Sequence, residues 1–284
     1  MSTIKNILAV ISDAASGRAT LQAALHVGAY LDCHVDALHV RPDPVAALPL
    51  VGEAMSGAMV DEMMVVAERE AEVRAKVARA MFDELNTAAR ESSSSGAASW
   101  LEDTGIEEQV VAVRACRADI IMLVRPTHEN ETTALMTLNA ALMQSGRAVL
   151  VVPPPHSAQS SSKFKRVAVF WNGSIEATRA ITAALPFLVS ADQVTVLRVE
   201  EEEWFAPTED LEAFLGHHGV KTVISKVLPR QGRTSAALLA ATDESGADMM
   251  VMGAYTRSKL RQLILGSVTG YVMQHATLPV LLCH

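Results

Sequence analysis

The sequence predicts an α/β protein built from two tandem, open, five-stranded and mostly parallel sheets with helices on both faces. Its 284 residues suit about two domains. Half of the residues are hydrophobic and only 4% are aromatic, so aliphatic side chains supply the core, as is typical of parallel sheets covered by helices. Short apolar runs alternate with amphipathic segments, and the same order of segments occurs twice along the chain.

Each half begins with a β-branched apolar run, then an amphipathic segment, then a second apolar run. The runs are short enough to be buried strands, and the segments between them have helical periodicity. In the first half these elements are expected at 5–10, about 17–31 and 35–40, and in the second half at 165–170, about 175–188 and 193–199.

The halves also end alike, whereas their middles differ. An Ala-Asp pair opens the apolar runs 118–124 and 247–253, and each half closes on a further apolar strand, at 148–152 and 279–283. Between these features the first half has a long charged helical pattern from about Met59 to Arg90, where the second half has only about 209–215. Strands alternating with helices imply right-handed crossovers, so the chain is expected to be a tandem duplication of one unit.

The domain boundary is expected at a proline- and serine-rich stretch. Pro153, Pro154 and Pro155 stop a strand, and the serines that follow cannot bury apolar surface. The predicted division is a domain over 1–153, a linker over 154–163 and a domain over 164–284.

Acidic residues are concentrated in the first half. Residues 1–153 carry 20 acidic and 12 basic side chains, and residues 154–284 carry 12 of each, which gives the net charge of −8. This charge argues against a nucleic-acid binder. An anionic ligand would meet less repulsion in the second half.

The chain shows no sequence sign of a metal site, a secretory leader or a membrane span. Cys33, Cys116 and Cys283 are far apart without metal-ligand spacing, and a sparse, odd set fits a reducing compartment. No stretch of about 20 apolar residues occurs. We therefore expect a cytoplasmic protein that binds no metal and no membrane. The methionines between Met55 and Met64 can be read as helix packing or as a partner groove, and we favour helix packing.

Residues 252–269 form the segment with most chemical content. Gly253 ends a strand, where ligands of parallel sheets bind, and it permits a close approach of the backbone. Gly266 and Ser267 open a helix running to about His275, whose first amide N–H groups form a ready anion site. Arg257 and its basic neighbours lie between. The segment can thus be a phosphate cradle, although a plain turn between strand and helix remains the alternative.

With this segment the sequence resembles the universal stress protein family, whose nucleotide-binding members carry Gly-x2-Gly-x9-Gly-Ser/Thr. Gly253, Gly266 and Ser267 match the motif, Thr256 stands at its second glycine, and residues 274–282 also look like the family. The likeness extends in outline over both halves. It implies the adenine nucleotide alpha hydrolase-like, Rossmann-like fold and a tandem protein with two family domains.

The resemblance also implies a nucleotide site in the second half. Asn172 stands where the family has an Asp at the end of the first strand, Val199 would line the adenine, and the glycine loop would hold ribose and phosphates. Asn172-Gly173-Ser174 is equally suited to a helix N-cap. The residues expected to bind are Asn172, Val199, Gly253, Thr256, Arg257, Gly266, Ser267, Val268 and Thr269.

Two departures from the family pattern weaken this expectation. Thr256 would cost about 1–2 kcal/mol if its position needs a left-handed backbone. The run Glu200–Glu203 would repel phosphates if it lies near the pocket, unless Mg²⁺ intervenes. In the first half, Val124, Thr127, Thr137 and Leu138 stand at the motif positions, so that half is expected to bind no nucleotide and to pack against the second.

The expected function is therefore a stress-response regulatory protein that binds an adenine nucleotide, ATP with or without Mg²⁺, in its C-terminal domain. The alternative is an interaction or scaffold module of the same fold with no nucleotide. No catalytic set is recognisable, so ATP hydrolysis would at most be slow and incidental. The final strands 148–152 and 279–283 are apolar edges that need a partner, so we expect the halves to pair as an intramolecular pseudo-dimer that can dimerise again.

Overall fold

The computed structural model describes residues 4–45, 57–92, 98–126, 131–154, 164–199, 208–228, 234–255 and 267–284, in which strands and helices alternate. The first half contains β1 (Asn6–Val10), α1 (Ala14–Leu31), β2 (His34–Pro42), α2 (Gly57–Ser92), β3 (Ala98–Gly105), α3 (Glu107–Ala115), β4 (Ile120–Val124), α4 (Glu131–Gln144) and β5 (Ala148–Val152). The second half contains β6 (Arg166–Phe170), α5 (Ile175–Leu188), β7 (Gln193–Val199), α6 (Thr208–His217), β8 (Thr222–Val227), α7 (Thr234–Glu244), β9 (Met249–Gly253), α8 (Ser267–His275) and β10 (Val280–Cys283).

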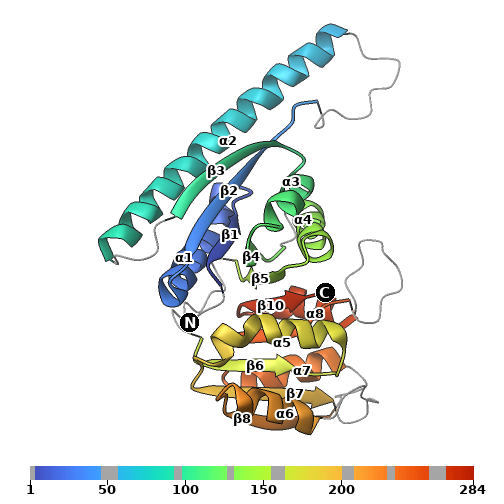
Figure 1. Ribbon diagram of the computed structural model, residues 1–284. Coiled ribbons are helices and arrows are strands. Elements are labelled where there is room, and N and C mark those ends of the chain that lie inside the picture. Colours follow the sequence, from blue (N-terminus) through green and yellow to red (C-terminus); the bar gives the residue numbers. More distant parts are fainter. Residues whose placement is uncertain are drawn as a thin grey trace.

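The two predicted five-stranded sheets are present and are joined edge to edge into one ten-stranded sheet, as Figure 1 shows. The strand order is β3-β2-β1-β4-β5-β10-β9-β6-β7-β8. All described neighbours run parallel except β5 and β10, which pair antiparallel with Leu150 opposite Leu281. The expectation that the final strands pair within the chain is confirmed.

The hydrophobic core continues across this joint on both faces of the sheet. Successive side chains of a strand point to opposite faces, so Leu150 and Leu281 enter one core cluster, while Val149 and Leu282 enter the other. The first cluster lies under α1, α2, α5 and α6, and the second lies under α3, α4, α7 and α8. The halves therefore share their core instead of only touching at a surface.

Local rules account for where the helices begin. α5 spans the predicted residues, and its N-cap is Ser174, whose hydroxyl accepts a hydrogen bond from the backbone N–H of Ala177 at 3.2 Å. α1 begins three residues before the predicted Gly17 because Asp13 caps it, accepting hydrogen bonds from the N–H groups of Ala15 and Ser16.

The outer strands of the sheet, β3 and β8, were not located from the sequence. β3 alternates between buried or half-buried and exposed positions, and β8 is largely half-buried or exposed. Each lies at an edge of the sheet, where a strand needs fewer apolar side chains than in the middle. Their sequences therefore lack the continuous apolar run that marks β4, β5 and β9.

The long helix α2 agrees closely with the charged pattern expected from about Met59 to Arg90. It packs on α1 and the neighbouring strands through Ala78 and Phe82, and a two-pronged ion pair joins its Glu84 to Arg18 of α1. Its N-terminal end reaches beyond the sheet (Figure 1). No helix in the described part of the chain is long and apolar enough to cross a membrane.

The predicted linker cannot be compared with the structure in full. Residues 155–163 lie outside the described residues, so the boundaries 1–153 and 164–284 stay a prediction. Phe164, directly after this stretch, is buried against Phe187 of α5, with 5.5 Å between the ring centroids. The second half is thus packed from its first residue.

Candidate functional site

The carboxyl ends of β6 and β9 meet where the chain order of the sheet reverses. β6 lies between β9 and β7, and Val169 of β6 pairs in register with Val251 of β9. Asn172 follows the end of β6, and Gly253 is the last residue of β9. In open parallel sheets the crevice for a ligand forms at such a reversal point.

Gly253 is held against the first turn of α5. A Cβ atom at this position would lie 2.6 Å from the backbone nitrogen of Ala177 and 2.8 Å from the carbonyl carbon of Glu176. Because backbone atoms cannot move aside as a side chain can, only glycine fits here. The close approach fixes β9 beside α5, and it explains the glycine without any ligand.

The turn between β6 and α5 has the conformation of a helix cap. The backbone N–H of Ser174 donates to Oδ1 of Asn172 at 3.2 Å, and Gly173 has a φ of 69°. The N-cap interpretation of Asn172-Gly173-Ser174 is therefore confirmed. Since the carbonyl oxygen of Asn172 serves its own turn, its side-chain amide NH₂ is the group suited to meet a ligand.

Trp171, which sequence reasoning missed, adds a further polar atom beside this turn. The residue is 6% exposed and belongs to the core cluster under α5, and among the described residues its indole Nε1 has no hydrogen-bond partner. A buried N–H without a partner carries a desolvation cost of about 1–3 kcal/mol. The sequence does not indicate a polar role for Trp171, because a tryptophan that follows an apolar strand is expected to be part of the hydrophobic core.

The remaining predicted residues divide into those that the structure places and those that it does not describe. Val199 at the end of β7 is buried and shares a core cluster with Val268, in the first turn of α8. Thr269 is buried beside it, and Ser267 is the first residue of α8, as predicted. Thr256, Arg257, Gly266 and the run Glu200–Glu203 lie outside the described residues.

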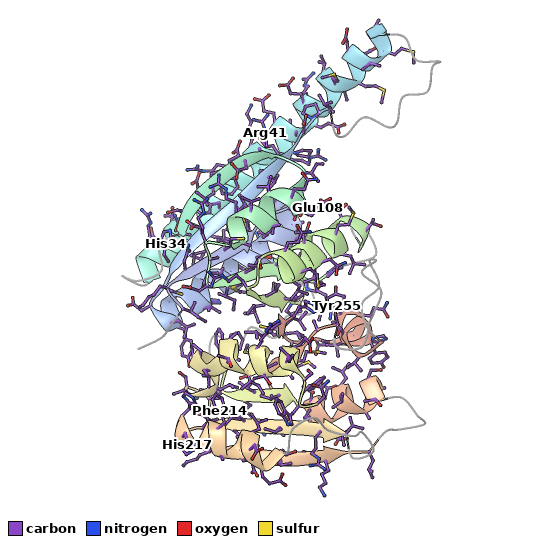
Figure 2. The ribbon with its side chains drawn as sticks, turned by 45° about the vertical axis from the view of Figure 1, so that its right-hand side comes forward. His34, Arg41, Glu108, Phe214, His217 and Tyr255 are labelled. Atoms are coloured by element: carbon purple, nitrogen blue, oxygen red, sulfur yellow. The ribbon has the colours of Figure 1, made fainter. Side chains whose placement is uncertain are left out.

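Tyr255 ties the end of β9 to the first half of the chain, as Figure 2 shows. Its hydroxyl donates to Oδ1 of Asn139 in α4, and its ring meets His284 edge-on with 5.9 Å between centroids. The residue has a left-handed φ of 64°, which a non-glycine residue adopts only when its surroundings hold it there. Burial raises the pKa of Tyr255 to about 12, so the hydroxyl stays a donor at physiological pH.

In the first half, three hydrogen-bonded side chains lie at the strand ends that correspond to those of β6 and β9, namely Ser12, Glu107 and Thr137. Ser12 corresponds to Asn172, because the residue before each donates its N–H to the second strand: Ile11 to Leu38, and Trp171 to Leu197. Oε1 of Glu107 accepts hydrogen bonds from the hydroxyls of Ser12 at 2.9 Å and Thr137 at 2.8 Å. The first half thus carries its own carboxylate where the second half presents Asn172.

Glu107 should make the stability of the protein depend on pH. Burial is the main cause of its raised pKa, opposed by the hydrogen bonds from Thr137 and Ser12. A raised carboxyl pKa means that stability is highest while the group is protonated and falls as pH rises through the native pKa. Glu107→Gln keeps both hydrogen bonds without the charge. Its free energy of unfolding is expected to exceed that of the wild type increasingly as pH rises from 4 to 8.

Urea titrations of both proteins across that range check this prediction. Glu108→Gln, at the neighbouring position of α3, serves as the control for a changed net charge. An offset between Glu107→Gln and wild type that does not change with pH would contradict a carboxyl whose pKa is raised in the folded protein.

Metal binding finds no support among the residues that the structure describes. These residues contain no group of three or more histidine, cysteine or acidic side chains placed to hold an ion. Cys33, Cys116 and Cys283 are free thiols. Burial raises the pKa of Cys33 to about 11 and that of Cys283 to about 12, so neither forms a reactive thiolate at neutral pH.

Comparisons with known proteins assign the fold. Over 98% of its length the chain matches 95% of a universal stress protein from Archaeoglobus fulgidus DSM 4304, with a TM-score of 0.66 and 18% identity. Over 99% it matches 92% of a protein of unknown function from Pseudomonas aeruginosa PAO1, with a TM-score of 0.60 and 13% identity. No curated protein matches the sequence.

The sequence signature of the universal stress protein family matches residues 163–284. This segment contains the whole candidate site, from Asn172 to Thr269. The first half shares the fold through the full-length structural matches and lies outside the matched signature. Residues 163–284 therefore belong to the universal stress protein family, and the chain as a whole has the tandem form of that fold.

Proposed function

We propose that the C-terminal half binds an adenine nucleotide, ATP with Mg²⁺, and that the protein acts as a regulator in a stress response. The observation that carries this proposal is the meeting of Asn172 and Gly253 at the reversal point of the sheet. Any hydrolysis of ATP would be slow and incidental, because the described residues of the expected site include no nucleophile with an adjacent base.

The described residues supply groups that suit the parts of a nucleotide. Val268, which is only partly buried against the cluster that contains Val199, offers apolar surface of the kind that an adenine ring covers. The side-chain amide of Asn172 is a donor near the strand ends. The first N–H groups of the nine-residue helix α8 favour an anion. The site therefore fits a nucleotide in its chemistry.

One experiment separates this function from its alternative. ATP and AMP, each with and without Mg²⁺, are titrated calorimetrically into the wild type and Gly266→Val. We expect saturable binding to the wild type and at least about a tenfold loss of affinity in the variant, equivalent to about 1.4 kcal/mol. Gly216→Ala in α6 is the matched control, because a Cβ atom there meets nothing within 4 Å.

The second candidate function is a module of the same fold that binds no nucleotide. Helix packing accounts for Gly253, and the cap accounts for Asn172, so neither residue demands a ligand. If the wild type gives no heat, no thermal shift and no nucleotide in mass spectra of the purified protein, the interaction module is the correct description.

A further inference from the structure

Helix α2 buries one apolar stripe. Ala71, Ala75, Ala78 and Phe82 follow one another at spacings of four, three and four residues and are all buried. Ala78 and Phe82 belong to the core cluster under α1 and α2, so this stripe packs the helix on the first half.

A second apolar stripe runs along the exposed side of the same helix. Met59, Met63, Val66, Val73 and Val77 follow at spacings of four, three, seven and four residues, and their exposed fractions lie between 38% and 55%. This is the heptad spacing that presents side chains to another helix, and at 1.5 Å per residue it extends over about 27 Å. The stripe is interrupted only at position 70, and exposed apolar side chains that line up in this way mark an interaction site, whereas single exposed residues do not. Met59 and Met63 lie in this stripe, so of the two interpretations of the Met55–Met64 segment, helix packing and a partner groove, the exposed positions suit the second.

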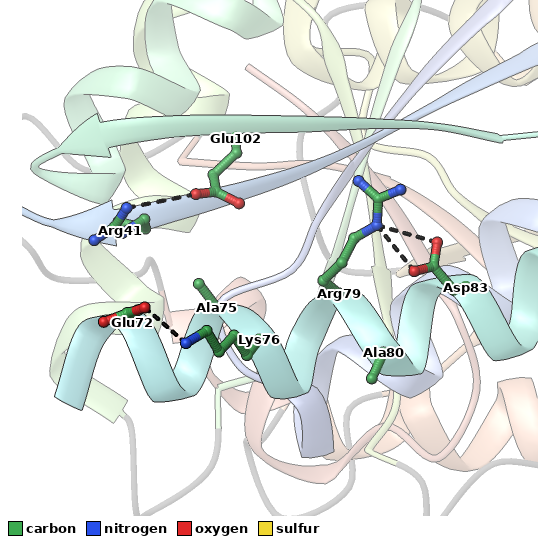
Figure 3. A pocket seen from close by; sticks show the side chains of 8 residues that line it. All are labelled: Arg41, Glu72, Ala75, Lys76, Arg79, Ala80, Asp83 and Glu102. Carbon is green, nitrogen blue, oxygen red and sulfur yellow. Dashed lines mark hydrogen bonds and ion pairs between the residues drawn. The ribbon is translucent and has the colours of Figure 1, made fainter. Parts of the chain in front are cut away.

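A charged groove borders the stripe and contains both signs of charge in equal number. Figure 3 shows this cavity of about 460 Å³ between α2, Arg41 of β2 and Glu102 of β3. Lys76 pairs with Glu72 at 2.7 Å, Arg79 with Asp83 at 3.0 Å, and Arg41 with Glu102 at 3.8 Å. Ala80 lines the groove and continues the heptad line of the stripe. Because its three cations and three anions pair within the chain, the groove presents no net charge that would repel a second copy approaching the stripe.

We propose that α2 pairs with α2 of a second copy of this chain, in antiparallel orientation, through the stripe Met59–Val77. Glu70 occupies the heptad position between Val66 and Val73, and in a parallel pair it would face its own copy. In an antiparallel pair centred between residues 71 and 72, Glu70 lies opposite Val73 of the second copy and next to its Arg74. The antiparallel pair thus places each exposed carboxylate beside a guanidinium.

Because β5 and β10 pair within one chain, a second copy of the chain has to associate through a different surface. The edge strands β5 and β10 are already paired with each other, so they offer no free edge. The second copy is therefore expected to associate at α2, on the far side of the first half from that joint (Figure 1). This association does not depend on nucleotide binding and can be tested separately from it.

Sedimentation of the full chain over a dilution series tests the stripe. We expect a dimer for the wild type and a monomer for Val73→Glu/Val77→Glu, with unchanged helical circular dichroism because both side chains are exposed. Val113→Glu, at a position of α3 that is 69% exposed, should remain dimeric. A wild type that is monomeric throughout, or a dimer that survives the double substitution, would overturn the proposal and leave the stripe to a different partner.

A charge exchange tests the antiparallel orientation. Glu70→Arg and Arg74→Glu each place like charges together across the pair, so each should raise the dimer dissociation constant by about tenfold or more. The double exchange restores opposite charges and should restore the dissociation constant. A double variant that dimerises no better than the single variants would overturn the antiparallel pairing.

Discussion

Replacing Leu150 with alanine is expected to lower the free energy of unfolding by about 2–5 kcal/mol. Leu150 is fully buried and lies opposite Leu281 in the antiparallel pair of β5 and β10. Removing its side chain leaves a cavity under the helices that cover both halves, and the close-packed core can fill that cavity only partly. Leu281→Ala should have a cost of the same size.

The double variant shows whether the two halves unfold together. Leu150 and Leu281 share one cavity, so their effects should not add, and the interaction energy should reach about 0.5–3 kcal/mol. Urea unfolding of the wild type, both single variants and the double variant provides the cycle. Leu228→Ala, at a position that is 62% exposed, is the control and should change stability by less than about 0.5 kcal/mol. Strict additivity of the two effects would contradict a shared core across the joint.

Gly253→Ala is expected to affect both the fold and the proposed nucleotide site. The new Cβ atom would stand 2.6 Å from the backbone nitrogen of Ala177, so β9 or the first turn of α5 must shift. Such overpacking typically costs about 1–3 kcal/mol. Because Asn172 sits in the turn that leads into α5, the same shift should weaken ATP binding by about tenfold or more.

The comparison with Gly216→Ala separates a local clash from a general effect of losing a glycine. Gly216 lies within α6, where alanine is the better helix former by about 1 kcal/mol and meets no neighbour. This control should be neutral or slightly stabilising and should bind ATP as the wild type does. If Gly253→Ala has wild-type stability and affinity, the contact with α5 does not constrain the site.

Periodicity alone gave most of the architecture. The runs that became β1, β4, β5, β6 and β9 are continuous and apolar because these strands are covered on both faces, and such runs are visible in a sequence. The pairing of β5 with β10 followed from their being apolar edges. β3 and β8 were missed because strands at the outer edges of the sheet bury less surface, so their sequences lack the continuous apolar run that marks the central strands.

Within the candidate site, the sequence predicted correctly only those contacts that a residue makes with its neighbours in the sequence. Asn172, Gly173 and Ser174 form a cap that local sequence rules describe. Gly253 was recognised as special, although its main constraint, the first turn of α5, comes from packing. The contacts of Tyr255 with Asn139 and of Glu107 with Ser12 and Thr137 join positions far apart in the chain. No spacing rule reveals such contacts, since they depend on how whole elements come together.

The antiparallel joint between β5 and β10 also sets how the molecule responds to dilution. When two separate chains meet along such an edge, their association is lost once the concentration falls below the dissociation constant. Here the connecting segment tethers the halves, and a short tether holds them at an effective concentration in the millimolar range. The assembly therefore persists at any expression level with a fixed one-to-one stoichiometry, so one partner can lose a ligand site while the other keeps it.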